Sequence, residues 1–259
     1  REFILNNGVK LVLQTEESDD RTGPYPVNLH GFSLGGAKLL PQEDYWSAIN
    51  APEIVRHSGV NGLNKFAIDR IISRTGLLPG AVAPYIDFSE HGIYGTAGSE
   101  NIETMMQLVY LFFTNPNHSR IAFEDWKRQT SKDYIHFSGK IYTRDFYNTL
   151  RSITGDMSLP TTFNRKGTPG GTEGFHSIKK TDFDKAFNIY KSFFGDARDF
   201  TFIITGDFEI EQILPLAQKY LGNLSASNSR GTKNQARPEL GEGPSLQILP
   251  NEGNYRMDN

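Results

Sequence analysis

The chain has 259 residues, of which 37% are hydrophobic, so it can form the core of one large domain or of two small ones. Its net charge of -3, with both signs mixed, argues against nucleic-acid binding, which needs a basic face. The absence of cysteine excludes disulfides, thiolate catalysis and Cys-ligated metal, and no apolar run approaches the about 18 residues of a membrane helix.

The spacing of apolar residues predicts strands and helices that do not strictly alternate. An Asn-Gly pair near the start predicts a hairpin, because this pair tolerates the positive φ of a tight turn. In chain order, the predicted elements are strands at Phe3–Leu5, Val9–Leu13 and Val27–Leu34, helices at Glu43–His57 and Asn61–Ser73, strands at Ala81–Phe88 and His91–Ala97, and helices at about Asn101–Phe113, Phe123–Phe137, Thr143–Ile153 and Asp182–Phe194.

Three local expectations accompany these elements. Pro52 removes a backbone hydrogen bond inside the first helix, which predicts a kink or a split near Ile49. Ser99 is expected to cap the helix that follows it, because a serine hydroxyl can satisfy the first free amides. In the second helix we expect five apolar side chains to be buried, namely Leu63, Phe66, Ile68, Ile71 and Ile72.

The stretch Asp199–Leu224 predicts a strand followed by a helix. Phe200–Thr205 is rich in β-branched and aromatic residues, which is typical of a buried strand, and Gly206-Asp207 ends it. Apolar residues then recur at helical spacing, at Ile210, Ile213, Leu214, Ala217 and Leu221. A strand that passes through a tight turn into an amphipathic helix is a core unit of a layered domain.

The order of elements predicts an α+β fold, with helices packed on one face of a mostly antiparallel or mixed sheet. We expect one domain over residues 1–224. Residues 225–259 are polar and rich in Gly and Pro, which predicts a linker leading toward a missing domain. The chain lacks an initiator Met and a signal-like segment, so we interpret it as a piece of a longer polypeptide.

Five segments carry, in this order, a resemblance to a known family. They are Phe3–Leu13 (FILNNGVKLVL), Phe32–Tyr45 (FSLGGAKLLPQEDY), His57–Ser73 (HSGVNGLNKFAIDRIIS), Gly95–Pro116 (GTAGSENIETMMQLVYLFFTNP) and the closing stretch described above. Together they resemble domains of the insulinase/pitrilysin-like zinc metallopeptidases, the inverzincins. Those homologous domains typically close with a strand, Gly-Asp/Asn-Phe, a helix and "YLG-L". The resemblance covers most of residues 2–224 and implies the fold of a metallopeptidase-family domain.

Catalytic members of this family carry His-x-x-Glu-His on a helix. Its histidines bind zinc, its glutamate activates the attacking water, and a glutamate on a later helix completes the site. Alignment on Gly59 puts Asn50, Glu53 and Ile54 at the three motif positions. Isoleucine binds no metal and an asparagine amide is a poor zinc ligand, so the resemblance implies neither zinc nor catalytic residues here. Asp133 is the acid nearest to the distal position.

Other patterns give weaker signals. Glu53 and His57 lie four residues apart and would share a helix face, but without further ligands we interpret them as a surface contact. The remaining histidines show no ligand spacing among themselves. No G-x-S-x-G elbow is present, so nothing supports a serine hydrolase.

Two glycine pairs are candidates for contact with a substrate. The stretch Gly167–Gly174 (GTPGGTEG) lacks the strand-to-helix context and the Gly-Lys-Ser/Thr ending of a phosphate loop. Glycine-rich loops are implicated in substrate handling in non-catalytic partners of related processing peptidases. The resemblance therefore makes the two pairs, Gly170 with Gly171 and Gly35 with Gly36, equal candidates for substrate-facing residues.

The family resemblance implies a chamber of several such domains, one of which binds zinc while others enclose an unfolded peptide. We interpret this chain as a non-catalytic domain, hypothetically the third, of a bacterial zinc-dependent metalloendopeptidase, inactive alone. Its expected partners are the other domains of the polypeptide and the peptide substrate, with zinc in the parent's catalytic domain. The expected compartment is the periplasm or cell envelope, and the cytoplasm stays open.

Two alternatives remain. The chain could belong to a catalytically dead scaffold or peptide-binding partner subunit of the same family, whose gene would lack an intact His-x-x-Glu-His motif. It could also be an unrelated hydrolase whose site these patterns do not reveal.

Overall fold

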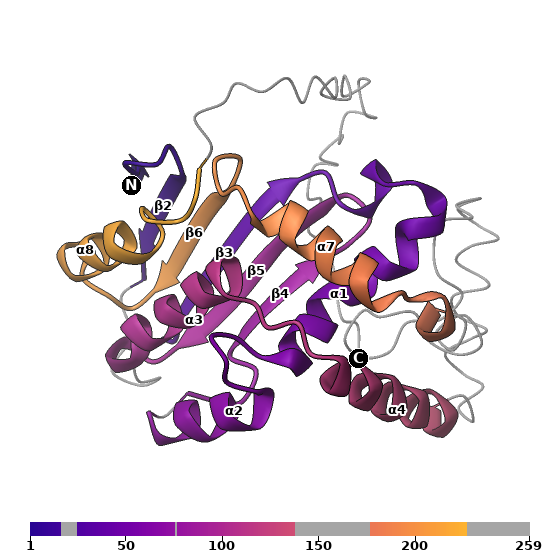
Figure 1. Cartoon of the computed structure of the whole chain (residues 1–259). Helices are drawn as coiled ribbons and strands as arrows, with labels where there is room; N and C mark the ends of the chain where they lie inside the picture. Colours follow the sequence, from indigo (N-terminus) through magenta and orange to yellow (C-terminus); the bar gives the residue numbers. More distant parts are fainter. Residues whose placement is uncertain (17–24, 76, 138–176, 227–259) are drawn as a thin grey trace, which may run out of the picture. The chain divides into compact units, whose positions relative to one another are not determined.

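A six-stranded mixed sheet forms the centre of the fold (Figure 1). The computed structural model describes residues 1–16, 25–75, 77–137 and 177–226, without the side chains of 133–137. The strand order is β1 (Glu2–Ile4), β2 (Lys10–Thr15), β6 (Thr201–Gly206), β3 (Val27–Leu34), β5 (Glu90–Ala97) and β4 (Val82–Ile86). Of these strand pairs, β2–β6 is parallel and the others are antiparallel.

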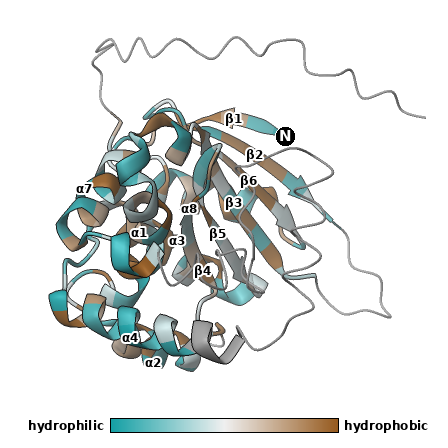
Figure 2. Ribbon diagram, turned by 90° about the vertical axis from the view of Figure 1, so that its right-hand side faces the viewer, coloured by the Kyte–Doolittle hydropathy of each residue, from teal (hydrophilic) through white to brown (hydrophobic). Residues whose placement is uncertain are grey.

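The helices of the described residues lie on one side of this sheet (Figure 2). They are α1 (Tyr45–Ser58), α2 (Lys65–Arg74), α3 (Ile102–Thr114), α4 (Arg120–Phe137), α7 (Phe183–Phe194) and α8 (Ile210–Tyr220). Short 3-10 turns occupy Ala37–Leu39, Gln42–Asp44 and Ser99–Asn101. This arrangement confirms the predicted α+β fold with helices on one face of a mixed sheet.

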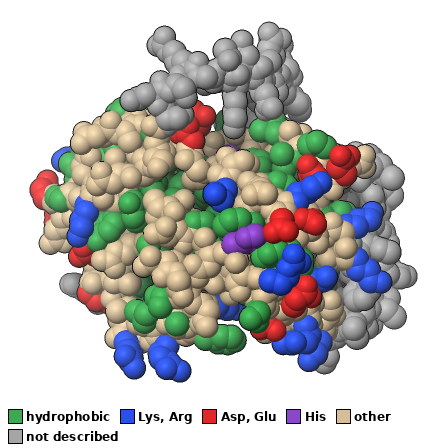
Figure 3. Space-filling view, viewed as in Figure 1, with side chains coloured by type: hydrophobic (Ala, Val, Ile, Leu, Met, Phe, Trp, Pro, Cys, Tyr) green, Lys and Arg blue, Asp and Glu red, His purple; other side chains and the backbone are tan. Residues whose placement is uncertain are grey.

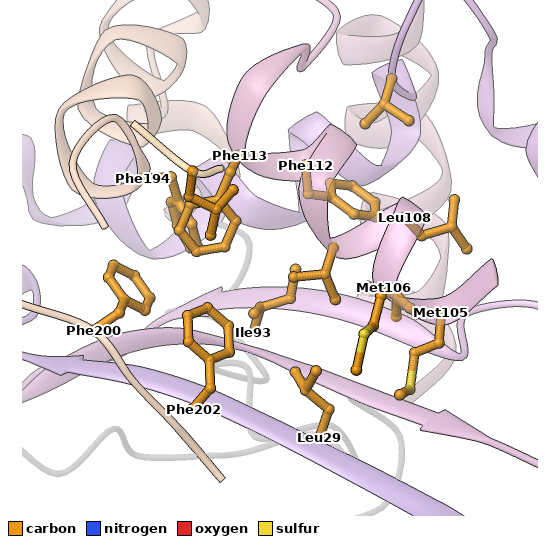
Figure 4. Close-up of a cluster of buried hydrophobic side chains, with 14 of the residues drawn as sticks. Leu29, Ile93, Met105, Met106, Leu108, Phe112, Phe113, Phe194, Phe200 and Phe202 are labelled. Atoms are coloured by element: carbon orange, nitrogen blue, oxygen red, sulfur yellow. The ribbon is translucent and has the colours of Figure 1, made fainter. Parts of the chain in front are cut away.

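Alternate side chains of the strands form the sheet's half of the core. Leu29 and Phe202 point toward α3, where Met105 and Phe113 meet them (Figure 4). Phe202 lies directly against Gly31, where an added Cβ would stand 2.3 Å from the ring. Burial of each large apolar side chain contributes about 1.5–3 kcal/mol. The glycine therefore makes room for the ring that anchors β6 to the helices.

The predicted N-terminal hairpin is present and holds the end of the last helix. β1 and β2 pair around Gly8, whose φ of 86° requires glycine. The Asn7 side-chain amide donates to the carbonyls of Leu221, at 2.8 Å, and Leu224, at 3.0 Å. These bonds tie the hairpin turn to the segment just beyond α8, where the Leu221 carbonyl also accepts from the Leu224 amide.

Pro52 does not split α1. The helix runs without interruption from Tyr45 to Ser58, and Pro52 is buried within it. A proline inside a helix costs about 3 kcal/mol in propensity, but α1 packs against α4, α7 and β4, and this packing outweighs the local cost. The predicted split near Ile49 is therefore wrong, and the kink, the other expected outcome, stays a prediction.

The burial predicted for the second helix is only partly correct. Ile68 and Ile72 are buried. The other three side chains, Leu63, Phe66 and Ile71, are 38%, 72% and 47% exposed. The helix begins later than expected, because the Asn64 side chain accepts from the amide of Ala67 and caps it. Only the stripe with Ile68 and Ile72 faces the core, and the other predicted apolar residues lie outside that stripe.

Other expectations differ in outcome. Ser99 starts a 3-10 turn, and α3 begins after Asn101 with no side-chain cap, so the predicted serine cap is wrong. The expected helix at Thr143–Ile153 lies outside the described residues. Residues 227–259 also lie outside them, and the predicted linker stays a prediction.

The surface on the helix side carries acidic and basic side chains interspersed with apolar ones (Figure 3). No large region of one charge is visible on this side. Within the described ranges, no helix is both long enough and apolar enough to cross a bilayer.

Candidate functional site

Two of the three residues on α1 that the sequence predicts to stand at the motif positions are used for packing. Ile54 is buried in the core at 2% exposure. Asn50 is also buried, and its amide donates to the Thr181 hydroxyl at 2.8 Å. That hydroxyl donates in turn to the Ser177 carbonyl at 2.7 Å. The helix face that would carry the first zinc-binding histidine therefore ties α1 to the segment that precedes α7.

Glu53, aligned with the glutamate of the motif, lies in a local ion-pair group. Its carboxylate lies 2.6 Å from the Arg56 guanidinium and 3.4 Å from the His57 ring, both on the same helix. The group is half-buried at the helix end. This arrangement agrees with the interpretation of Glu53 and His57 as a local contact on one helix face.

The glycine pair after β3 is shaped by close packing. Gly35 has a φ of 94°, which favours glycine. An added Cβ on Gly36 would lie 2.1 Å from the Asp87 carbonyl oxygen, in the β4–β5 turn. Local packing thus explains why both residues are glycine, and the substrate-facing role stays a prediction. The second predicted pair, Gly170 and Gly171, lies outside the described residues.

His91 contacts this glycine turn from the helix side of the sheet. Its ring lies among the rings of Phe193 and Phe200, and its Nδ1 lies 3.0 Å from the Gly35 carbonyl. Burial lowers the pKa of His91 to about 4. The ring is therefore neutral at pH 7 and donates from Nδ1 to Gly35.

An aromatic cluster lies on the sheet face turned away from the described helices. We use this name for His30, Phe32, Tyr85 and Tyr94, which come from β3, β4 and β5. The His30 and Tyr94 rings are stacked with centroids 4.4 Å apart, and Tyr85 stacks on Tyr94 at 4.8 Å. Tyr94 remains 48% exposed, so the cluster presents an aromatic surface.

A short hydrogen-bonded chain fixes these rings. The Tyr85 hydroxyl donates to the Glu90 carboxylate at 2.7 Å, and its oxygen lies 2.8 Å from His30 Nε2. Because the phenol proton is already donated, His30 Nε2 must carry the hydrogen of the second bond. Tyr85 can lie flat across the sheet because Gly92 has no side chain; a Cβ there would stand 2.7 Å from the phenol oxygen.

Burial sets the charge of the cluster. It lowers the pKa of His30, and the Glu90 carboxylate opposes this shift only in part. It raises the pKa of Tyr85, and the hydrogen bond to Glu90 raises it further. At neutral pH both rings are therefore uncharged, and Glu90 is the acidic group beside them.

Next to the cluster, the same face has a hollow of about 270 Å³. It is lined by the rings of His30 and Tyr94, by the aliphatic Ile203 and by the polar Asn28, Thr96 and Thr205, together with Leu29 and Gly95. These side chains belong to three neighbouring strands, β6, β3 and β5.

Two curated relatives align with most of the chain. The "Probable zinc protease PqqL" of Haemophilus influenzae is 28% identical over 227 residues, which are 87% of this chain and 22% of that protein. The "Zinc protease PQQL-like" of Arabidopsis thaliana is 23% identical over 235 residues, 86% of this chain and 19% of that protein. No family model matches the chain.

A solved structure has the same fold. The periplasmic protease PqqL of Escherichia coli matches 88% of this chain and 23% of its own, with a TM-score of 0.63 at 15% identity. Its first half alone gives a TM-score of 0.67 at 13% identity, over 89% of this chain and 48% of that structure. The chain is homologous to one part of the PqqL-like zinc proteases. It spans about a fifth of the length of the curated relatives it matches.

The motif positions of this chain do not fit the zinc that the names of the PqqL-like proteases mention. Ile54 has no donor atom, and the Asn50 amide is engaged with Thr181. Within the described ranges, no three His, Asp or Glu side chains are grouped as metal ligands. Asp133, the candidate for the distal acid, lies in α4, and its side chain is not among those described.

Sequence reasoning missed the aromatic cluster. The strands that carry it were predicted, and their two-residue alternation places His30, Tyr85 and Tyr94 on a surface opposite the core. The missing information was the register, which sets His30 opposite Tyr94 and Tyr94 opposite Ala83. Without it, His30 counted only as one of several scattered histidines.

Proposed function

We propose that this chain is a non-catalytic, chamber-forming domain of a multidomain zinc-dependent peptidase. In this role it encloses a peptide substrate while another domain of the same polypeptide binds zinc and cleaves. The observation that carries the proposal is the use of the α1 motif positions for packing, with Asn50 bonded to Thr181 and Ile54 in the core.

Two further observations support this role. The chain spans about a fifth of its zinc-protease relatives, which leaves room for a separate catalytic domain. The sheet face turned away from the described helices carries exposed aromatic and polar side chains, a composition that suits contact with an extended peptide. We retain the hypothesis that the domain is the third of the parent protein.

The proposed partners are the other domains of the same polypeptide and a peptide substrate. The proposed compartment is the bacterial periplasm or cell envelope, because the E. coli relative is a periplasmic protease. The net charge of -3, with both signs mixed on the face drawn in Figure 3, supports no role in nucleic-acid binding.

The second candidate is a catalytically dead scaffold or peptide-binding partner subunit of the same family. The same degenerate positions on α1 favour it, because they are what a member without protease function would also carry. The two proposals differ in the rest of the gene, which contains an intact His-x-x-Glu-His motif only under the first.

The first test measures bound zinc by elemental analysis and peptide cleavage on the same dialysed sample of the 259-residue chain. We expect neither bound zinc nor cleavage. In the parent protein, deletion of residues 1–226 should leave zinc bound but abolish cleavage of unfolded peptides. Stoichiometric zinc with chelator-sensitive cleavage by this chain alone would overturn the proposal. A parent that binds no zinc would favour the scaffold.

A further inference from the structure

The hollow beside the aromatic cluster is built from uncharged groups. Its side-chain lining contains two rings, one branched aliphatic side chain and three amide or hydroxyl side chains, from His30, Tyr94, Ile203, Asn28, Thr96 and Thr205. No Asp, Glu, Lys or Arg lines it. A charged ligand group would lose its hydration there without gaining a counter-ion, so the lining selects a neutral occupant.

The size of the hollow restricts the occupant further. Pockets for whole drug-sized ligands typically have volumes of about 300–1,000 Å³. The hollow, at about 270 Å³, lies below that range and is open on the sheet surface. It can therefore hold a single large side chain, with the rest of the ligand lying outside it across the strands.

Neighbouring side chains hold the Tyr94 ring of the hollow in place. The Tyr94 ring stacks on the rings of His30 and Tyr85, and the Tyr85 hydroxyl is hydrogen-bonded to Glu90. A ring that is already held loses little conformational freedom on binding, which favours affinity. The exposed part of Tyr94 offers an aromatic or aliphatic group a stacking surface, and Ile203 adds an apolar contact.

We propose that this hollow is a subsite for one aromatic or large aliphatic side chain of an extended polypeptide that lies across β6, β3 and β5. The lining supports a polypeptide as the occupant, because it includes the polar side chains of Asn28, Thr96 and Thr205. The Thr96 hydroxyl donates to the Asn28 side-chain oxygen at 3.0 Å, which leaves the Thr96 oxygen able to accept from a peptide N–H. This subsite rests on the proposed function and gives the chamber wall a preference for apolar residues in the substrate.

The test is an NMR titration of the 259-residue chain, which detects weak binding, with two probes. One is an unstructured peptide of Gly, Ser and Ala with a single central phenylalanine, and the other has serine in place of that phenylalanine. We expect shifts at Tyr94, Thr96 and Ile203, and about tenfold weaker binding of the serine peptide. Tyr94→Ala and Ile203→Thr should remove the preference for phenylalanine.

Phe66→Ala is the matched control, because Phe66 is a 72% exposed aromatic residue on α2, on the helix side of the sheet. It should leave the binding of both peptides unchanged. Urea unfolding of each variant checks that the fold is retained, as expected for the half-exposed Tyr94.

The outcomes of this test distinguish a failure of the subsite from a failure of the proposed peptide-enclosing role. If both peptides bind equally well and Tyr94→Ala changes neither, the subsite is wrong while a peptide-enclosing role stands. If neither peptide causes shifts anywhere on the open sheet face, both the subsite and the peptide-enclosing role are overturned. Shifts confined to the glycine turn at Gly35 and Gly36 would move the subsite there and refute the hollow.

Discussion

The Asn50 side chain bridges α1 and the segment before α7, in a place where water cannot replace it. Its amide donates to Thr181, and both residues are buried. Asn50→Ala should lower the free energy of unfolding by about 1–3 kcal/mol, because it leaves the Thr181 hydroxyl without this donor. Urea unfolding measures the change.

Asn223→Ala is the control for that experiment. The Asn223 amide also makes a hydrogen bond, to the Lys219 carbonyl at 2.9 Å, but the bond is exposed and water can replace it. We expect a change within about 0.5 kcal/mol. Equal effects of the two substitutions would mean that the buried bond to Thr181 does not anchor α1.

His91 makes the stability of the domain depend on pH. Burial lowers its pKa from 6.5 to about 4, against the opposing effect of its hydrogen bonds to the backbone of Gly35 and Phe193 and of the nearby carboxylates. Between these values the unfolded chain binds a proton that the folded chain does not, so stability is complete above about pH 6.5 and falls as the pH drops toward 4. A difference of this size corresponds to about 3 kcal/mol.

The substitution His91→Phe tests this linkage. Phenylalanine keeps an aromatic ring beside Phe193 and Phe200 but cannot take up a proton. It loses the bond to Gly35, which should cost about 1 kcal/mol at neutral pH. The further loss of stability on acidification, measured by urea unfolding, should be smaller than in the unmodified protein by up to about 3 kcal/mol. An unchanged pH dependence of stability in His91→Phe would contradict the role of His91 in this linkage.

At the scale of single residues, sequence reasoning was most informative where chemistry forbids a role. Ile54 has no atom that could bind zinc, so this role is excluded without knowledge of the fold. The structure places Ile54 in the core. Asn50 was identified as a poor ligand, but its partner Thr181 is 131 residues away and no local pattern indicates that pair.

The β1–β2 hairpin and the end of α8 stabilise each other at the element scale. Asn7 in the turn donates to Leu221 and Leu224, Leu224 is 2% exposed, and the Ala197 amide donates to the Ser225 carbonyl. A chain that ends after Ala226 keeps all of these contacts. We expect its free energy of unfolding to lie within about 0.5 kcal/mol of that of the whole chain.

A chain that ends after Asn223 is the matched comparison. It lacks the buried Leu224 side chain and the carbonyls of Leu224 and Ser225. We expect it to be destabilised by about 2–5 kcal/mol through lost burial and unpaired donors. Differential scanning calorimetry of both truncations measures the effect. A large loss of stability already in the chain that ends after Ala226 would show that residues 227–259 belong to the domain, against the predicted boundary.

Elements with a strong local signal could be predicted from the sequence. The strand at Val27–Leu34 matches β3 in both bounds, because alternation and the following glycines define it. The second helix shows where local signals fail. Phe66 and Ile71 are exposed because α2 is packed along one stripe only, a fact of tertiary arrangement that helical spacing does not contain. The strand register that brings the aromatic cluster together is likewise a feature of tertiary arrangement that local sequence patterns do not contain.

At the scale of the whole molecule, the two faces of the sheet have different compositions. One face buries side chains such as Leu29 and Phe202 against the helices. The other carries the aromatic cluster, the hollow and a row of amide and hydroxyl side chains, with no described helix over it. A domain that forms a wall needs this asymmetry, because one face must hold the fold together while the other stays available to a ligand.

The role of Glu53 can be tested only in the parent polypeptide. A glutamate that acts as general base contributes about 10²–10⁴-fold to the rate, so its conversion to glutamine would be severe in a catalytic domain. Here Glu53 is held by Arg56 and His57 on its own helix, and Ile54 and Asn50 are the residues predicted at the positions of the zinc ligands. Glu53→Gln should therefore leave kcat for peptide cleavage by the parent within about twofold.

The stability of the parent should change little as well, because a partly exposed ion pair is typically worth about 0–1 kcal/mol. The comparison is the same substitution in an intact His-x-x-Glu-His motif elsewhere in that polypeptide, which should abolish cleavage. If Glu53→Gln alone lowers kcat by a hundredfold or more while the zinc content is unchanged, this domain takes part in the chemistry, and its assignment as a chamber wall is wrong.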